Sequence, residues 1–133
     1  MDKRNTAYFI VVGLFSAGYT FSSIMDLFGV GPAHVTLAHL GYPAYVATIL
    51  GIWKAGAVAT LLAPRLPLLK EWAYAGIVFD LTGGLASHLI SGDRLPMPLM
   101  PLFFLALAMT SYVLRPASRR LAISPFATAA IAA

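Results

Sequence analysis

The chain has 133 residues, of which 59% are hydrophobic and only 11% are charged, with a formal net charge of +4. A soluble domain carries roughly 25% charged residues, so this composition excludes an ordinary water-soluble domain and favours a chain surrounded by lipid. The chain contains no cysteine, which excludes disulfides, thiol redox relays, thiolate metal sites and covalent haem attachment.

The hydrophobic residues gather in four long blocks rather than in short alternating runs. The blocks cover residues 6–28, 43–63, 71–91 and 97–114. Each block is long enough to cross a hydrocarbon core as a helix, which takes about 20 residues. We therefore predict an all-α fold: one integral membrane domain over residues 1–133, built as a bundle of four transmembrane helices.

The first block also has some features of a secretory signal. Asp2-Lys3-Arg4 resembles the positive region of a signal, and Ser16-Ala17-Gly18 resembles a cleavage site of small residues. However, the apolar run continues past this site to Ile24, which is longer than the core of a signal peptide. We interpret the block as a membrane span.

The loop over residues 29–42 separates the first two spans. Pro32 is suited to the first turn of a helix, so we expect a short helix from Pro32 to Leu40 at the interface or in the mouth of the bundle.

The second connection reads APRLPLLKEW, and its two prolines act as helix breakers. We expect Lys70, Glu71 and Trp72 to be anchors at the membrane interface. The third connection, SGDRLPMPLMP, is short and rich in proline. The tail over residues 115–133 holds no segment long enough to span, and we interpret it as a frayed or interfacial segment.

The basic residues predict the topology. With four spans, Arg94 falls on one side of the membrane, and seven basic residues fall on the other: Lys3, Arg4, Arg65, Lys70, Arg115, Arg119 and Arg120. This excess predicts that both termini of this multi-pass membrane protein are cytoplasmic. The positive charge is explained by topology and lipid contact, and it is no signature of nucleic-acid binding, since no soluble element carries a basic face.

Two charged residues lie deep in the predicted spans. Lys54 is roughly 16 Å into the second span and Asp80 roughly 15 Å into the third, at 1.5 Å per residue. A charge at the bilayer centre costs about 2.5–3.5 kcal/mol, so such residues face the bundle interior and find partners. We predict that Lys54 pairs with Asp80. The pair either serves a reaction or only fixes the register of two helices.

A second polar set is expected in the outer half of the bundle. Asp26 ends the first span, His88 lies near the outer end of the third, and the loop above carries His34 and His39. A polar stripe leads along the first span toward Asp26: Ser16, Tyr19, Thr20 and Ser23. On the third span, Asp80, Gly84 and Ser87 share a face. The pattern predicts a polar cavity open to the outer side, with Lys54 and Asp80 at its floor.

Each of these features has a plainer interpretation. Serine and threonine stripes often bond neighbouring helices, and Gly51, Gly56 and the Gly83-Gly84 pair serve close helix approach in the simplest interpretation. His34 and His39 are about 140° apart around a helix, which does not suit chelation. We therefore predict no metal site and see no haem signature.

Several stretches resemble the DoxX-like family of small four-helix bacterial membrane proteins. They are HLGYP (39–43), GIWKAGA (51–57), LKEWAYAGIVFDLTGG (69–84) and SHLISGD (87–93). The resemblance covers nearly the whole chain except the alanine-rich tail. It implies little about activity, because the family takes its name from a subunit of an archaeal thiosulfate:quinone oxidoreductase, other relatives are linked with redox complexes or receptor assembly, and many members have no assigned activity.

We predict a site for a hydrophobic small molecule, quinone- or lipid-like, in an oxidoreductase subunit or in an isomerase or cyclase that works by proton transfer. The predicted catalytic residues are Asp80, Lys54 and His88. The predicted substrate-binding residues are Ser87, Asp26, Thr20, Ser23 and Tyr45. A quinone is the cofactor that this site would take, and membrane lipids, a second copy or a partner membrane subunit are the partners expected.

The alternative is a non-catalytic accessory or assembly subunit, chaperone-like in role. An exposed stripe of small residues on the fourth span would favour it, and Leu105, Ala106, Ala108 and Met109 hint at such a stripe. A proton-linked carrier is a third hypothesis, but the chain shows no inverted repeat.

Overall fold

The computed structural model describes residues 2–122, and these residues form an all-α structure. Its helices are α1 (Lys3–Phe28), α2 (Gly31–His39), α3 (Ala44–Leu62), α4 (Pro67–Ile90) and α5 (Leu99–Leu114), followed by one turn of 3-10 helix, η1 (Ala117–Arg119). Four of these helices coincide closely with the four predicted hydrophobic blocks. The short helix predicted between Pro32 and Leu40 is confirmed as α2.

Glycine and proline set the helix boundaries. α1 ends at Gly29, whose φ of 64° is the left-handed conformation that glycine adopts without strain. α2 and α4 each have a proline in the first turn, where a missing N–H costs nothing. The prediction placed the third span at residues 71–91, but Pro67 starts the helix one turn earlier because proline also suits a first turn.

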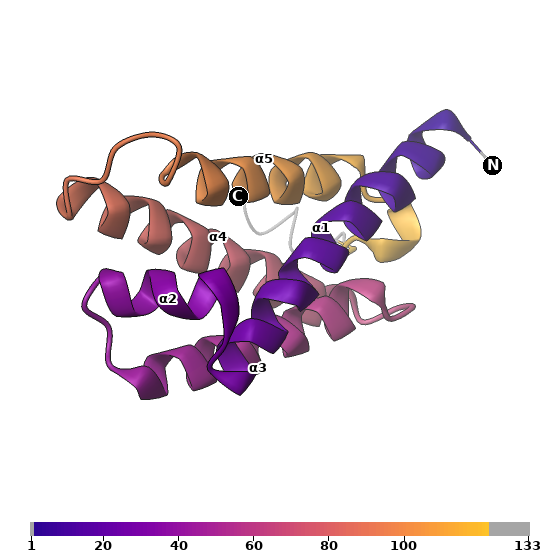
Figure 1. Cartoon of the computed structure of the whole chain (residues 1–133). Coiled ribbons are helices and arrows are strands. Elements are labelled where there is room, and N and C mark those ends of the chain that lie inside the picture. The colour runs from indigo at the N-terminus through magenta and orange to yellow at the C-terminus, as the bar shows by residue number, and fades with distance from the viewer. Residues whose placement is uncertain (1, 123–133) are drawn as a thin grey trace, which may run out of the picture.

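Each long helix packs on its neighbours in sequence, and α5 closes the ring against α1. α1 and α4 are therefore diagonal partners, as are α3 and α5. α2 lies against α1 and α3, next to the end of α1 and the start of α3 (Figure 1). Figure 1 shows the N-terminus, the α3–α4 loop and η1 at one end of the bundle and α2 with the α4–α5 loop at the other.

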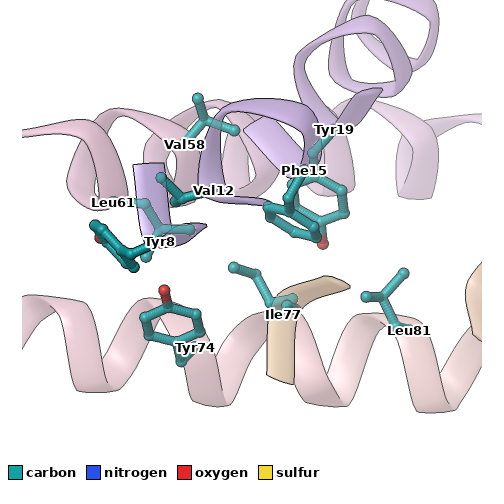
Figure 2. Close-up of a cluster of buried hydrophobic side chains, with 10 residues drawn as sticks. Tyr8, Val12, Phe15, Tyr19, Val58, Leu61, Tyr74, Ile77 and Leu81 are labelled. Atoms are coloured by element: carbon teal, nitrogen blue, oxygen red, sulfur yellow. The ribbon is translucent and has the colours of Figure 1, made fainter. Parts of the chain in front are cut away.

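The core is a cluster of aromatic and branched side chains from all four long helices. Figure 2 shows α1 and α3 contributing one side of the cluster and α4 the other. Its buried members are Tyr8, Val12, Phe15, Tyr19, Val58, Leu61, Tyr74, Ile77, Leu81 and Ala108. Tyr74 also hydrogen-bonds Ser111 at 2.9 Å, so this buried hydroxyl has a partner.

The outside of the bundle is apolar, as expected for a protein in lipid. Large exposed side chains include Trp53, Trp72 and Phe79. Within residues 2–122, α1, α3 and α4 are long and apolar enough to cross a membrane. α5 has 16 residues and rises about 24 Å, less than the hydrocarbon core of about 30 Å.

Lys70 corrects one prediction. It was expected to be an interfacial anchor, yet it is completely buried. Its ammonium donates hydrogen bonds to the carbonyl oxygens of Thr60, Leu61 and Ala63 at the end of α3. The last carbonyls of a helix have no partner within the helix, so Lys70 satisfies the end of α3 and ties α4 to it.

Candidate functional site

Lys54 lies in the middle of α3 and bonds to α1. Its ammonium donates to Ser22 Oγ at 3.0 Å and to Asp26 Oδ2 at 2.8 Å. The Asp26 side chain is fully buried and that of Lys54 is 12% exposed. Ser22 and Asp26 are four residues apart, so one face of α1 presents both groups to the ammonium.

The predicted salt bridge between Lys54 and Asp80 is therefore wrong. The depth estimate compared only Lys54 and Asp80 along their own helices and treated Asp26 as a boundary residue. α1 packs directly on α3, which brings Asp26 to the lysine first. A buried charge is costly unless it is paired, and the carboxylate that α1 brings to Lys54 is that of Asp26.

Asp80 is bonded by a tyrosine instead. The hydroxyl of Tyr19 donates to Asp80 Oδ2 across the diagonal of the bundle, from α1 to α4. Figure 2 shows Tyr19 beside Phe15, on the α1 side of the cluster that faces Ile77 and Leu81 of α4. The Lys54 ammonium lies 5.6 Å from the centre of the Tyr19 ring. Tyr19 thus links the two charged residues, through a cation–π contact to Lys54 and a hydrogen bond to Asp80.

A cavity of about 790 Å³ opens beside these groups. Its walls come from α3 and α4, with Tyr19 as the contribution of α1, and most of them are apolar. Both tryptophans of the chain, Trp53 and Trp72, line it. We call this cavity the α3–α4 groove. Its polar groups are Lys54, Asp80, Tyr19 and Thr60, and its volume lies in the range of about 300–1,000 Å³ that is typical of small-molecule sites.

The direction of the opening differs from the prediction. A recess open to the outer side was expected. Within the described chain, however, neither the segment between α1 and α3 nor the α4–α5 loop contributes a residue to the groove. Ile52, Trp53 and Phe79 line the groove and are also strongly exposed on the outside of the bundle. The groove therefore opens sideways, on the surface that lipid would cover.

The glycines explain part of this shape. A Cβ on Gly51 would lie 2.7 Å from a Leu27 side-chain carbon, so Gly51 does serve the close approach of α1 and α3. Gly56 and Gly76 have no atom within 4 Å of such a Cβ, and both line the groove. The expectation of close helix packing is wrong for Gly56 and for Gly83, since a Cβ at either position would meet no atom within 4 Å.

His88 and Ser87, which the sequence placed in the site, lie in the last turn of α4, at the end of the bundle that carries α2. His88 Nδ1 and His39 Nε2 donate to the two carboxylate oxygens of Asp93, each at 2.7 Å. These hydrogen bonds lower the pKa of Asp93 below its usual range. Ser87 bonds Tyr42 at 2.7 Å. Neither His88 nor Ser87 lines the α3–α4 groove.

The other predicted substrate-binding residues do not line the α3–α4 groove either. Ser23 is buried, and its hydroxyl donates to the Gly51 carbonyl at 2.6 Å, so it fastens α1 to α3. Thr20 and Tyr45 are exposed and lie outside the groove. Asp26 takes part only as the partner of Lys54.

Two further predictions can be compared with the structure. Among residues 2–122, no group of three histidine, aspartate or glutamate side chains is arranged to hold a metal ion. Of the predicted stripe of small residues on the fourth span, only Ala106 is exposed, whereas Ala108 is fully buried and Leu105 and Met109 pack against the core. The four residues therefore do not form a continuous exposed surface.

The sequence reasoning missed three important groups. Tyr19 was noted only as a member of a polar stripe, and Ser22 and Asp93 were not singled out. The spacing of Ser22 and Asp26 was a readable signal, since residues four apart share a helix face. Asp93 had no such signal, because its partners come from α2 and α4.

A family model described as the DoxX-like family matches residues 10–111. The match includes Tyr19, Lys54 and Asp80 and covers most of the chain. Comparisons with curated proteins and with solved structures gave no match.

Proposed function

The chain belongs to the DoxX-like family, and from that premise we propose that this membrane protein binds a hydrophobic small molecule, quinone- or lipid-like, in the α3–α4 groove. The single observation that carries the proposal is the composition of the groove, which has apolar walls open to the bilayer and a few polar groups at one place. Such a site suits a ligand with an apolar tail and a polar head.

Lys54 is suited to bind the polar head. An ammonium has three N–H donors, and two of them are used by Ser22 and Asp26. The third is available to a carbonyl or oxyanion of a ligand in the groove. A donor in a water-poor site strongly stabilises negative charge that develops on such an oxygen.

Asp80 is suited to exchange protons. Lys54 is the one cation of this cluster, and its salt bridge goes to Asp26, so Asp80 has no basic partner within 4 Å among the described residues. Tyr19 donates to one of its oxygens. We propose that the Tyr19–Asp80 pair gives a proton to the bound head or takes one from it, in place of the predicted Asp80–His88 pair. An oxidoreductase subunit and a proton-transfer enzyme both use this chemistry.

We also propose four membrane crossings with both termini in the cytoplasm of a bacterial cell, in its inner membrane. The grouping of the basic residues at one end of the bundle supports this. Because the chain has no cysteine, single cysteines report topology cleanly. A membrane-impermeant maleimide should label Ser91→Cys in intact spheroplasts and should label Ser118→Cys only after lysis. The reverse pattern would contradict the orientation.

Tryptophan fluorescence tests the ligand site, since both tryptophans line the groove. A short-chain ubiquinone or menaquinone analogue, added to the protein in nanodiscs, should quench this fluorescence saturably. Gly76→Leu should remove the saturable part, because Gly76 lines the groove and an added Cβ there meets no atom within 4 Å, so the new side chain has room to occupy the groove.

Gly83→Leu is the matched control. Gly83 is also on α4 with no atom within 4 Å of a Cβ, but it does not line the groove. Saturable quenching should persist in this variant. Quenching that never saturates, or that is unchanged by Gly76→Leu, would refute the binding site and favour the accessory-subunit alternative.

A further inference from the structure

His39, His88 and Asp93 lie at one end of the bundle. The opposite end carries an excess of positive charge. It brings together the start of α1, the α3–α4 loop, the end of α5 and η1 (Figure 1). Its basic residues are Lys3, Arg4, Arg65, Lys70, Arg115, Arg119 and Arg120. The acidic side chains on these segments are Asp2 and Glu71. This end therefore has far more cations than anions.

Part of this charge has a structural use. Lys70 and Arg119 donate to the last carbonyls of α3. Arg115 is almost fully buried, forms a salt bridge with Glu71 at 2.8 Å, and stacks 4.0 Å from the centre of the Tyr112 ring. Glu71 also accepts a hydrogen bond from the Tyr112 hydroxyl, so its carboxylate is already occupied.

Arg4 and Arg120 are different, because neither forms a salt bridge among the described residues. The Glu71 carboxylate lines the same cavity, but it is paired with Arg115. Arg4 and Arg120 each donate from Nη2 to the same acceptor, the carbonyl oxygen of Val113, and each bond is 3.0 Å long. The two Nη2 atoms are therefore no more than twice that distance apart. Two guanidinium groups held this close repel each other, and a bound anion would relieve the repulsion.

A cavity lies at this point. It measures about 460 Å³, and its lining includes Arg4, Arg115, Arg120 and Tyr112. Each guanidinium has five N–H donors, and the bonds described above use only some of them. Planar guanidinium groups bind phosphate oxygens in pairs, with more geometric specificity than a lysine would give.

The surroundings indicate which phosphate is suitable. The cavity lies at the end of α5. Val113 lines it and is 65% exposed, and Phe9 and Ile10 are exposed on the neighbouring helix α1. A molecule that places its phosphate among the arginines would have apolar side chains beside it for acyl chains.

We infer that this cavity binds the phosphodiester headgroup of an anionic phospholipid, held by Arg4 and Arg120 with Arg115 behind them. This lipid site is separate from the α3–α4 groove and does not depend on the proposed function. The lipid ties the start of α1 to the end of η1, because Arg4 lies in the first turn of α1 and Arg120 directly follows η1.

Binding of defined lipids to the full chain tests the inference. Dioleoyl phosphatidylglycerol and dioleoyl phosphatidylcholine are titrated against the protein in a neutral detergent, and retained lipid is counted by native mass spectrometry. We expect one phosphatidylglycerol to be retained in preference to phosphatidylcholine. The Arg4→Gln, Arg120→Gln double variant should lose about tenfold or more of this preference, the loss expected when a charge-assisted hydrogen bond to the phosphate is removed.

The matched control is Lys3→Gln with Arg65→Gln, which removes the same charge from the same end without touching the cavity. It should change the preference by less than about threefold, the part expected from the screened surface potential. Equal losses in the two double variants would overturn the inference, because diffuse attraction would then explain the preference.

Two measurements on the unaltered chain keep the inference testable if the arginine variants fold poorly. Equal retention of the two lipids by the wild-type protein would overturn it. Inorganic phosphate, added at a concentration of about 10 mM, should leave the retained phosphatidylglycerol in place. Displacement by phosphate would mean that the cavity holds a free anion, which would also overturn the lipid assignment.

Discussion

Lys70 and Lys54 are both withdrawn from water, but they have different partners. Lys70 is bonded to three backbone carbonyls at the end of α3, and all its donors are used. Lys54 is bonded to two side chains, retains one donor and faces a cavity. A cation whose donors are all bonded to backbone carbonyls has a structural role. A cation that keeps a free donor beside a cavity is a candidate for ligand binding or catalysis, so burial alone does not identify a functional charge.

The largest expected effect is on stability, from Lys70→Met. The change leaves the last carbonyls of α3 without their ammonium donor, and no second substitution can remove a backbone carbonyl. We expect the free energy of unfolding to fall by about 3 kcal/mol, from the loss of several charge-assisted hydrogen bonds. Unfolding in mixed micelles measures it. A loss below about 1 kcal/mol would contradict the structural role of Lys70.

The pair of Lys54 and Asp26 should behave in the opposite way. Lys54→Met with Asp26→Asn removes both charges, and replacing a buried ion pair as a unit is often close to neutral for stability. We expect unfolding to change by less than about 1 kcal/mol. The affinity for the quinone analogue should fall about tenfold, the loss expected for one hydrogen bond from a charged donor.

Fluorescence quenching and micelle unfolding on the same preparation give both numbers for this double variant. Unchanged affinity would break the comparison, since Lys54 would then be as structural as Lys70. A large loss of stability with unchanged affinity would contradict it still more directly.

Tyr19→Phe should have a smaller effect. It keeps the ring and its packing against Phe15 but removes the hydrogen bond to Asp80. The expected loss of stability is about 1 kcal/mol. If the two groups act together on the ligand, Tyr19→Phe and Asp80→Asn should be non-additive in a double-mutant cycle of binding free energies. Additive effects would separate Tyr19 from the site.

The smallest effect is expected at Asp93, whose two oxygens each accept one hydrogen bond and which lies in the loop between α4 and α5. His88 and His39 lower the pKa of Asp93, so its stabilising contribution is complete above the ordinary aspartate pKa of 3.8 and is lost as the pH falls through the lower folded-state pKa. The free energy of unfolding is measured from about pH 2 to about pH 5, a range of roughly one unit or more on either side of that pKa. This acid-induced loss should be absent in Asp93→Asn. An identical profile in the variant would refute the contribution.

Hydropathy was a good guide to the fold because membrane helices must satisfy their own backbone, which leaves long apolar runs as a clear signal. The boundaries of α1 and α3 follow directly from those runs with their glycine and proline ends. α2 was predicted from one proline in a loop. The sequence could not show how the helices pack against one another, and this packing decides which side chains come into contact.

The candidate site illustrates this limit. Lys54 and Asp80 were found because a charge in an apolar span is conspicuous, and both do line the groove. Their bonds were not predicted, because position along a helix gives depth and not direction around the axis. Lys70 was misinterpreted for a related reason: a lysine near a helix end looks interfacial in sequence, whether it turns toward water or back onto carbonyls.

The sideways opening of the α3–α4 groove changes what a useful affinity means. A molecule that enters from the bilayer has already left water, so its tail gains little more by moving between Trp53 and Phe79. Occupancy is then set by the mole fraction of the molecule among the surrounding lipids. Discrimination between lipophilic molecules must come from the head that reaches Lys54, Tyr19 and Asp80, and molecules with the same tail can differ greatly in residence.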